Sequence, residues 1–168
     1  MRQIPSTITP IYKNINYESC GYFDLDKPKA VTFQYKWCLS FNDTEISAVQ
    51  NKDGKWSFIN SKLEPLTDFI YDDIERVGAD NEFFQVNLGN GYGLLNSKLE
   101  KILEIEFESI DIVDDYSLED HFEEIKHFSA TKNKSEELYR LDGTPHSEQR
   151  YNYILLEKHP YVDELFWV

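Results

Sequence analysis

One block of sequence recurs along the chain at a spacing of 36 residues, and this spacing constrains the fold more than any other feature. Residues 56–63 (WSFINSKL) align with residues 92–99 (YGLLNSKL), and one step back reaches residues 20–24 (CGYFD). Each copy has an apolar residue, a small residue, two apolar residues, and then Asn or Asp. Self-similarity at a fixed period indicates a repeat architecture.

A second block keeps the same spacing and supports this interpretation. Residues 71–74 (YDDI) match residues 107–110 (FESI) one step later. A fourth copy follows if residues 46–52 align with residues 128–134 at an offset of 82, which predicts about ten extra residues in the third copy. We therefore predict a single repeat-built domain over residues 1–168, with copies near 20–55, 56–91, 92–137 and 138–168, the last of which includes a C-terminal cap.

Each copy is predicted to contain a β-hairpin. Residues 55–59 have the pattern of a strand, Asn60, Ser61 and Lys62 form a tight turn, and residues 63–66 form the return strand. Because one hairpin cannot bury its own apolar face, neighbouring copies must stack on it. We predict an all-β, mainly antiparallel fold of tandem β-hairpin repeats of about 36 residues. The aromatic core positions are Trp56, Tyr71, Tyr92 and Phe107.

The second position of the first block is small in three copies, which have Gly21, Ser57 and Gly93 there. A small residue inside a strand lets an aromatic ring or a neighbouring backbone come close. The predicted alignment puts Tyr139 at this position in the fourth copy, so we expect that copy to pack differently.

The repeat resembles the WG repeat found in many bacterial proteins. The resemblance is carried by residues 55–60 (KWSFIN) with residues 71–74, and by residues 92–96 (YGLLN) with residues 107–110. The Trp-Gly pair itself is not intact, because Ser57 follows Trp56. The resemblance implies a curved or propeller-like array of β-hairpin repeats without established catalytic residues, so function is not transferred with the fold.

The extra residues of the third copy, near 112–126, form an acidic insertion. Ten acidic residues lie between positions 104 and 126, against the single basic residue Lys126. Leu118, Phe122 and Ile125 recur at helical spacing, which predicts one short helix near 117–126. An insertion on one face of a repeat array is often a binding face, and a solvated acidic loop is the alternative. The predicted partner-binding residues are Asp114, Asp115, Glu119, Asp120 and Glu123.

The formal net charge of −14 restricts the possible partners. Such a chain is repelled by nucleic acids and by anionic membranes, so the expected partner is a basic protein. The N-terminus lacks a secretory signal and no segment has membrane-spanning length, so a cytoplasmic location is expected. Cys20 and Cys38 fit no metal or redox spacing, and we expect each to be a small buried hydrophobic residue.

No motif points to catalysis, a metal or a cofactor. His121 and His127 are six residues apart and would face different sides of a helix, so we predict no metal site. The glycine-rich residues 89–93 lack the lysine of a phosphate-binding loop. The sequence favours a non-enzymatic protein–protein interaction module, with an immunity or antitoxin protein as its more specific form. The alternative is a small-ligand-binding or hydrolytic protein that uses a groove between repeats, and the oligomeric state stays open.

Overall fold

The computed structural model describes residues 7–26, 31–41, 44–78, 82–113 and 127–146. Over these residues the chain forms twelve strands in four small sheets, and neighbouring strands pair antiparallel. The predicted all-β fold is therefore confirmed. No helix occurs among these described residues, and so none that could cross a membrane. The short helix predicted near 117–126 and the predicted C-terminal cap lie outside them.

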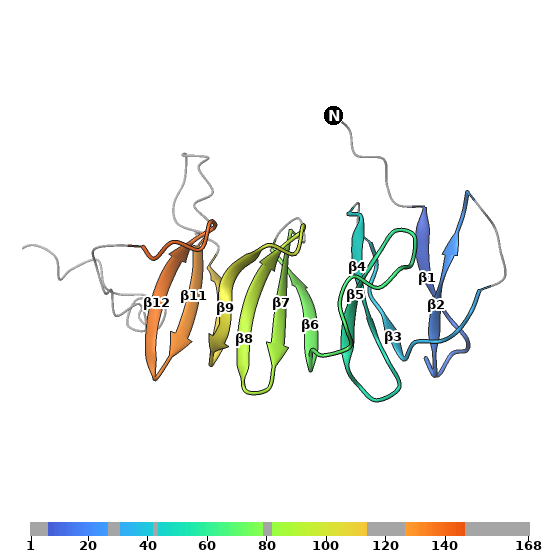
Figure 1. The fold of residues 1–168 in the computed structure, drawn as a ribbon, viewed down its shortest axis with the longest axis horizontal. Coiled ribbons are helices and arrows are strands. Elements are labelled where there is room, and N and C mark those ends of the chain that lie inside the picture. Colours follow the sequence, from blue (N-terminus) through green and yellow to red (C-terminus); the bar gives the residue numbers. More distant parts are fainter. Residues whose placement is uncertain (1–6, 27–30, 42–43, 79–81, 114–126, 147–168) are drawn as a thin grey trace, which may run out of the picture.

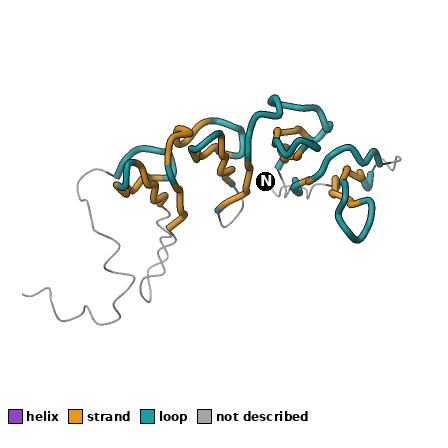
Figure 2. The backbone as a smooth tube through the Cα atoms, turned by 90° about the horizontal axis from the view of Figure 1, so that it is seen from below, coloured by secondary structure: helices purple, strands orange, loops and turns teal. Residues whose placement is uncertain are grey.

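The four sheets follow one another along the chain. The first sheet contains β1 (Ile8–Tyr12) and β2 (Cys20–Asp24), and the second contains β3 (Trp37–Cys38), β4 (Ile46–Gln50) and β5 (Trp56–Asn60). The third contains β6 (Asp73–Val77), β7 (Phe83–Leu88), β8 (Gly91–Asn96) and β9 (Lys101–Phe107), and the fourth contains β10 (Ser109–Val113), β11 (His127–Lys132) and β12 (Ser135–Arg140). The sheets stand side by side (Figure 1) in an open, gently curved row (Figure 2).

The 36-residue repeat is visible in the backbone pairing. In each of three copies, the first residue of the first block pairs antiparallel with the aromatic residue of the second block. The amide of Trp56 donates to the carbonyl of Tyr71 at 2.8 Å, and the equivalent bond between Cys20 and Tyr35 is also 2.8 Å. The three pairs are Cys20 with Tyr35, Trp56 with Tyr71, and Tyr92 with Phe107.

The fourth copy has a different register from the predicted one. The isolated bridge between Ile59 and Pro65 recurs between Tyr139 and Pro145, which is an offset of 80 residues. The predicted offset of 82 is therefore wrong by two residues. Tyr139 occupies the position of Ile59, not that of Ser57, and its side chain is buried as that of Ile59 is.

The turns explain this error. In residues 60–64 and again in residues 140–144, the first amide donates to the fifth carbonyl and the fourth amide donates to the first carbonyl. Arg140 therefore corresponds to Asn60. The sequence alignment matched Asn60 to Asp142 by residue type, but Asp142 lies inside the turn, where its carboxylate accepts a bond from a backbone amide.

The predicted return strand at residues 63–66 is also wrong, because only the single bridge between Ile59 and Pro65 forms there. Proline has no N–H and cannot donate to a β-ladder. Lys101 stands 36 residues after Pro65, and it begins the strand β9. The difference between proline and lysine at this position is consistent with a single bridge in one copy and a strand in the next.

The small residues of the repeat allow backbone to cross over them, as predicted. A Cβ atom on Gly93 would lie 2.9 Å from the Cα of Ile105, and one on Gly21 would lie 2.3 Å from the carbonyl oxygen of Thr32. The hydroxyl of Ser57 instead donates a 2.6 Å hydrogen bond to a carbonyl of the return segment. The return segment thus lies close to the strand in all three copies, and between β8 and β9 it forms a bulge.

The apolar core lies between consecutive sheets. Successive side chains of a strand face opposite ways, so Phe58 faces the third sheet and Ile59 faces the first. The N-terminal junction, between the first and second sheets, buries Cys20, Tyr22, Cys38, Phe41, Val49 and Ile59. The central junction, between the second and third sheets, buries Ala48, Trp56, Phe58, Tyr71, Ile74, Phe84, Val86 and Leu95. The C-terminal junction, between the third and fourth sheets, buries Phe83, Leu94, Leu103, Phe107, Ile110, Phe128, Ala130 and Tyr139.

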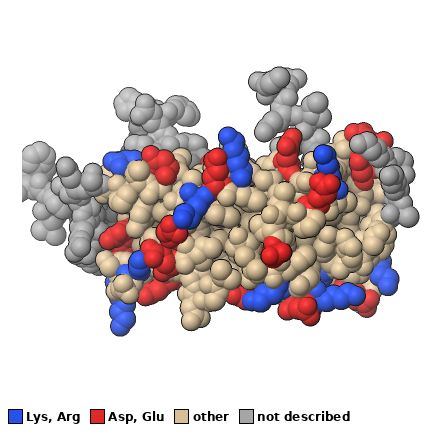
Figure 3. Space-filling model, in the orientation of Figure 1, with Lys and Arg blue, Asp and Glu red and all other residues tan. Residues whose placement is uncertain are grey.

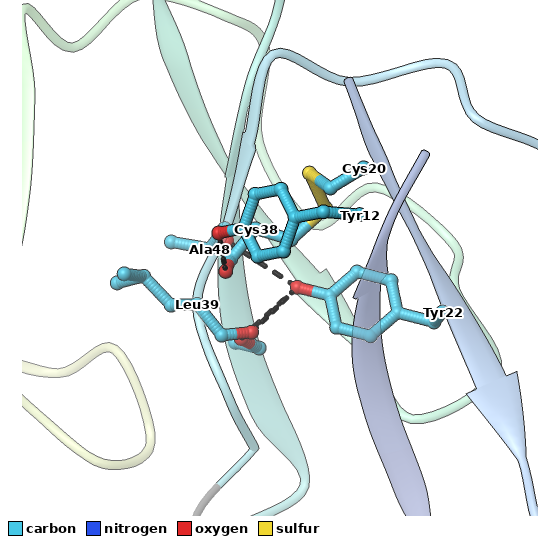
Figure 4. Close-up of a disulfide and its surroundings, with 7 residues drawn as sticks. Tyr12, Cys20, Tyr22, Cys38, Leu39 and Ala48 are labelled. Carbon is cyan, nitrogen blue, oxygen red and sulfur yellow. Dashed lines mark hydrogen bonds between the residues drawn. A yellow bond between two sulfur atoms is a disulfide. The ribbon is translucent and has the colours of Figure 1, made fainter. Parts of the chain in front are cut away.

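Cys20 and Cys38 form a disulfide between β2 and β3 (Figure 4). Their burial was predicted, and they are 0% and 4% exposed. Their assignment as separate buried hydrophobic residues is wrong. The sequence reasoning considered metal and redox spacings only, and it did not use the repeat, which places the two residues on facing strands of neighbouring sheets.

Candidate functional site

The predicted partner-binding residues lie outside the described part of the chain. They are Asp114, Asp115, Glu119, Asp120 and Glu123. The first of them, Asp114, directly follows Val113, the last residue of β10. What the structure describes is therefore the strand from which this segment departs and the surface beside that strand.

An acidic groove lies beside β10. It has a volume of about 280 Å³ and is formed by β6, β7 and β8 of the third sheet together with residues 108–111. Its carboxylates are Asp73, Glu75, Glu108 and Asp111, and no Lys or Arg lines it. Gln85, Asn87, Tyr92 and Ser109 supply further polar groups.

The alternation of β6 sets the direction of two of these carboxylates. Ile74 is 2% exposed and points into the central junction, so its neighbours Asp73 and Glu75 point to the opposite face of β6. Ile110 is buried in the C-terminal junction, and Asp111 beside it is exposed. The exposure of these acidic residues thus follows from where the repeat places its apolar residues.

Amide side chains stand opposite the carboxylates of β6. Asp73 pairs across the strands with Asn87, and Glu75 pairs with Gln85. This face of the third sheet therefore offers donors as well as acceptors to a ligand.

The sequence analysis missed the acidic groove, although the repeat contained a signal for it. A step of 36 residues takes Ile74 to Ile110 and Glu75 to Asp111. Because a strand residue next to a buried one faces away from the core, the exposure of Glu75 and Asp111 beside this repeated apolar position was predictable from the sequence.

A second groove opens at the central junction. It has a volume of about 490 Å³, and its lining includes Leu39, Trp56 and Arg76. Asp73 and Glu75 line this groove as well. The strand β6 therefore forms a wall of both grooves.

Arg76 is held in place by the second sheet. Its guanidinium donates to the hydroxyl of Thr44 at 2.9 Å, to the carbonyl of Phe41 at 3.3 Å and to the carbonyl of Ile46. It also lies 4.5 Å from the centre of the Phe84 ring. Burial lowers the pKa of Arg76 to about 10, so the side chain keeps its charge at neutral pH.

An exposed ion pair links the second and third sheets near the central junction. The carboxylate of Asp72 accepts a hydrogen bond from the ammonium of Lys55 and another, 2.7 Å long, from the amide of Gly89. These two hydrogen bonds, with that of Lys55 the stronger cause, lower the pKa of Asp72 below its ordinary value.

The described surface carries both signs of charge. Figure 3 shows acidic and basic side chains interspersed over the face in view. The net charge of the chain is therefore not spread as one uniform acidic field over that face, and a groove whose charged lining residues are all acidic is a local feature.

The two histidines considered for metal binding are separated by the limits of the described chain. His121 lies outside it, while the ring of His127 lies 5.0 Å from the ring of His146. Among the described residues, no group of three or more His, Cys, Asp or Glu side chains could hold a metal ion.

Comparisons of the chain with known protein families, with curated proteins and with solved structures gave no match.

Proposed function

We propose that the chain is a non-enzymatic protein–protein interaction module that binds a basic protein through an acidic surface. The acidic groove is the observation that carries this proposal. Four acidic residues and no Lys or Arg are among the residues that line it. A cationic side chain that enters the groove would be attracted to these carboxylates.

In the proposal, the predicted residues of the acidic insertion take part in binding together with the groove. Asp111 belongs both to β10 and to the groove lining, and the predicted partner-binding residues begin three positions later with Asp114. The groove would fix the register of the partner, and the insertion would add long-range attraction. Electrostatic complementarity of this kind mainly raises the association rate and the specificity.

We further propose that the chain belongs with the WG-repeat proteins. The equivalent backbone bridges at a spacing of 36 residues support this relationship. An immunity or antitoxin protein that neutralises a basic toxin is the most specific form of the proposed function. Strong acidity and the lack of a catalytic motif in the sequence support it. The cytoplasmic location expected from the N-terminal sequence is not included, because the Cys20–Cys38 disulfide favours an oxidising compartment.

A partner captured from the cells that produce the protein, and identified by mass spectrometry, allows a charge test. The groove variant combines Asp73→Asn, Glu75→Gln, Glu108→Gln and Asp111→Asn. The matched control changes the net charge equally with Asp26→Asn, Glu45→Gln, Asp53→Asn and Asp68→Asn, all exposed residues outside the groove. An insertion variant changes the five predicted residues to their amides.

The association rate at two salt concentrations is the quantity to measure. The groove and insertion variants are each expected to associate on the order of tenfold more slowly, with a weaker salt dependence, while the control changes little. Equal rates for the groove variant and the control would remove the groove from the proposal. A captured partner that is acidic would contradict the whole proposal.

A small-ligand-binding or hydrolytic protein is the second candidate. The presence of two grooves beside repeat junctions favours it, since one has Tyr92 with four carboxylates and the other has Trp56 beside Arg76. Pockets of some hundreds of Å³ that combine aromatic and charged groups are typical ligand sites. A compound library screened for thermal stabilisation tests this candidate. A stabilising compound that loses its effect in the groove variant but not in the control would favour it.

A further inference from the structure

The N-terminal junction differs from the other two at a pair of equivalent positions. A step of 36 residues takes Cys20 to Trp56 and Cys38 to Ile74, and these two residues share the buried core of the central junction. The next step reaches Tyr92 and Ile110, which pack in the C-terminal junction. The repeat therefore places this pair of positions in the apolar core of each junction, and only the first pair is a pair of cysteines.

Two free thiols would fill this position poorly. Cys20 and Cys38 have side chains far smaller than those of Trp56 and Ile74, yet they are 0% and 4% exposed. Protein cores are close-packed, and unfilled volume in a core is destabilising. A covalent bond between the two sulfur atoms offsets the stability that is lost because the small side chains pack less apolar volume.

The first sheet is also the smallest of the four sheets in the described part of the chain. It contains only β1 and β2 among the described residues, and an isolated two-stranded hairpin is marginally stable in water. The first sheet therefore depends on its attachment to the second sheet, and the disulfide joins β2 directly to β3.

We propose that the Cys20–Cys38 disulfide is a permanent structural lock of the first sheet, formed during maturation in an oxidising compartment. Two thiols lose two protons and two electrons when the S–S bond forms. A disulfide-bearing oxidant, either a protein or a small molecule, takes up both electrons and both protons by thiol–disulfide exchange and is itself reduced to two thiols. Disulfides of this kind persist in oxidising compartments and are rare where thiols are kept reduced.

The surroundings of the disulfide favour a structural role over a switch. Thiol–disulfide exchange requires a thiolate to reach a sulfur atom, and both cysteines are buried. Tyr12 and Tyr22 line the junction beside them, and their hydroxyls donate to the carbonyls of Cys38 at 3.4 Å and Leu39 at 2.7 Å (Figure 4). The folded protein therefore shields the bond from reductants.

An aromatic cluster reports on the same junction. The ring of Tyr12, whose residue pairs with Cys20, lies 4.9 Å from the ring of Tyr17 and 5.9 Å from that of Trp37, the neighbour of Cys38. Loss of the disulfide should separate these rings. The fluorescence of Trp37, obtained as the difference from a Trp37→Phe variant, then gives a signal specific to this junction.

Thiol trapping tests the redox state directly. Cells that produce the protein naturally are treated with a thiol-alkylating reagent at harvest, and the peptides that contain Cys20 and Cys38 are examined by mass spectrometry. We expect the disulfide-linked peptide pair with almost no alkylated form. The folded protein should also keep the bond in a millimolar solution of reduced glutathione. Alkylated cysteines in the cells, or rapid reduction of the folded protein, would overturn the proposal.

Two double variants test the structural role. Cys20→Ser with Cys38→Ser should lower Tm by roughly 5–10 °C and change the Trp37 signal. Cys20→Trp with Cys38→Ile, which installs the pair found in the central junction, should recover part of this loss and be insensitive to reductants. A serine variant as stable as the native protein would contradict the lock. A Trp/Ile variant no more stable than the serine variant would contradict the equivalence of the junctions.

Discussion

The N-terminal and central junctions use opposite faces of the same sheet and are held together differently. In the central junction the Phe58 and Phe84 rings pack edge to face with their centres 4.9 Å apart, and Arg76 bonds across to the second sheet. In the N-terminal junction a disulfide and the hydroxyl of Tyr22 connect the sheets. The central junction is held by packing and noncovalent bonds, whereas the junction of the two-stranded first sheet has a covalent bond in addition.

The largest expected effect comes from emptying the core of the central junction. Phe58 is fully buried and contacts the rings of Tyr71 and Phe84. Phe58→Ala should lower the free energy of unfolding by about 3–5 kcal/mol, as measured by denaturant titration. The control is Phe33→Ala, which removes a ring that is 36% exposed and should cost less than about 1 kcal/mol. Equal losses in the two variants would show that packing does not hold the central junction.

A disulfide transplanted into the central junction tests whether the junctions are equivalent. Trp56→Cys with Ile74→Cys places thiols at the positions that match Cys20 and Cys38, with the same separation of 18 residues. The new pair should crosslink, and the oxidised form should be more stable than the form with this pair reduced by about 3 kcal/mol. Peptide mass spectrometry identifies the crosslink. Absence of a bond between positions 56 and 74 would contradict the equivalence.

A smaller effect is expected from the hydrogen bond of Tyr22 in the N-terminal junction. Tyr22→Phe removes a donor to the carbonyl of Leu39, which Ser47 also contacts at 2.8 Å, so the loss should be about 1 kcal/mol. Burial raises the pKa of Tyr22 well above its ordinary value. The contribution of the protonated phenol is therefore complete below the unfolded pKa of about 10 and declines as the pH rises beyond it. We expect denaturant titrations to show a smaller difference in the free energy of unfolding between the native protein and Tyr22→Phe at pH 11 than at pH 8. The same difference at both pH values would contradict a role for the protonated phenol.

The smallest effect is expected at the exposed ion pair near the central junction. The pKa of Asp72 is lowered by its bonds to Lys55 and Gly89. Its contribution to stability is therefore present above the unfolded pKa of about 4 and lost as the pH falls through the lower folded value. Asp72→Asn should lower Tm slightly at pH 6, and the difference should vanish near pH 2. A thermal melt series over this range checks the result, with Asp26→Asn, outside the groove, as the exposed control. A difference in Tm between the native protein and Asp72→Asn that grows as the pH falls would contradict the stabilising role of the ionised carboxylate.

Repeat spacing was enough to predict the class of the fold but not every register. The 36-residue offset located three equivalent bridges, because it is carried by the buried aromatic positions Trp56 and Tyr71 and their equivalents. The fourth copy was misplaced by two residues, because residue type was matched where turn geometry decides the register. Pro65 already indicates in the sequence that the return segment at residues 63–66 cannot form a complete β-ladder, because proline has no N–H to donate.

The candidate site was only partly predictable. Acidity pointed to a surface for a basic partner, but the groove depends on how the third sheet and residues 108–111 lie beside each other. The exposure of Asp73, Glu75 and Asp111 follows from the burial of Ile74 and Ile110 and was predictable from the repeat, whereas this arrangement of the two sheets was not. The disulfide was missed for a related reason, since pairing two cysteines requires knowing that consecutive sheets stack face to face.

Hydrogen exchange of the oxidised protein and of the protein refolded in the reduced state tests the difference between the junctions most directly. Loss of the bond should speed amide exchange in β1 and β2 on the order of a hundredfold, the equivalent of about 3 kcal/mol, and leave β7 and β8 unchanged. This result would show that the disulfide holds the N-terminal junction while packing holds the rest. Unchanged exchange in β1 and β2, or equal acceleration in all four sheets, would contradict the account.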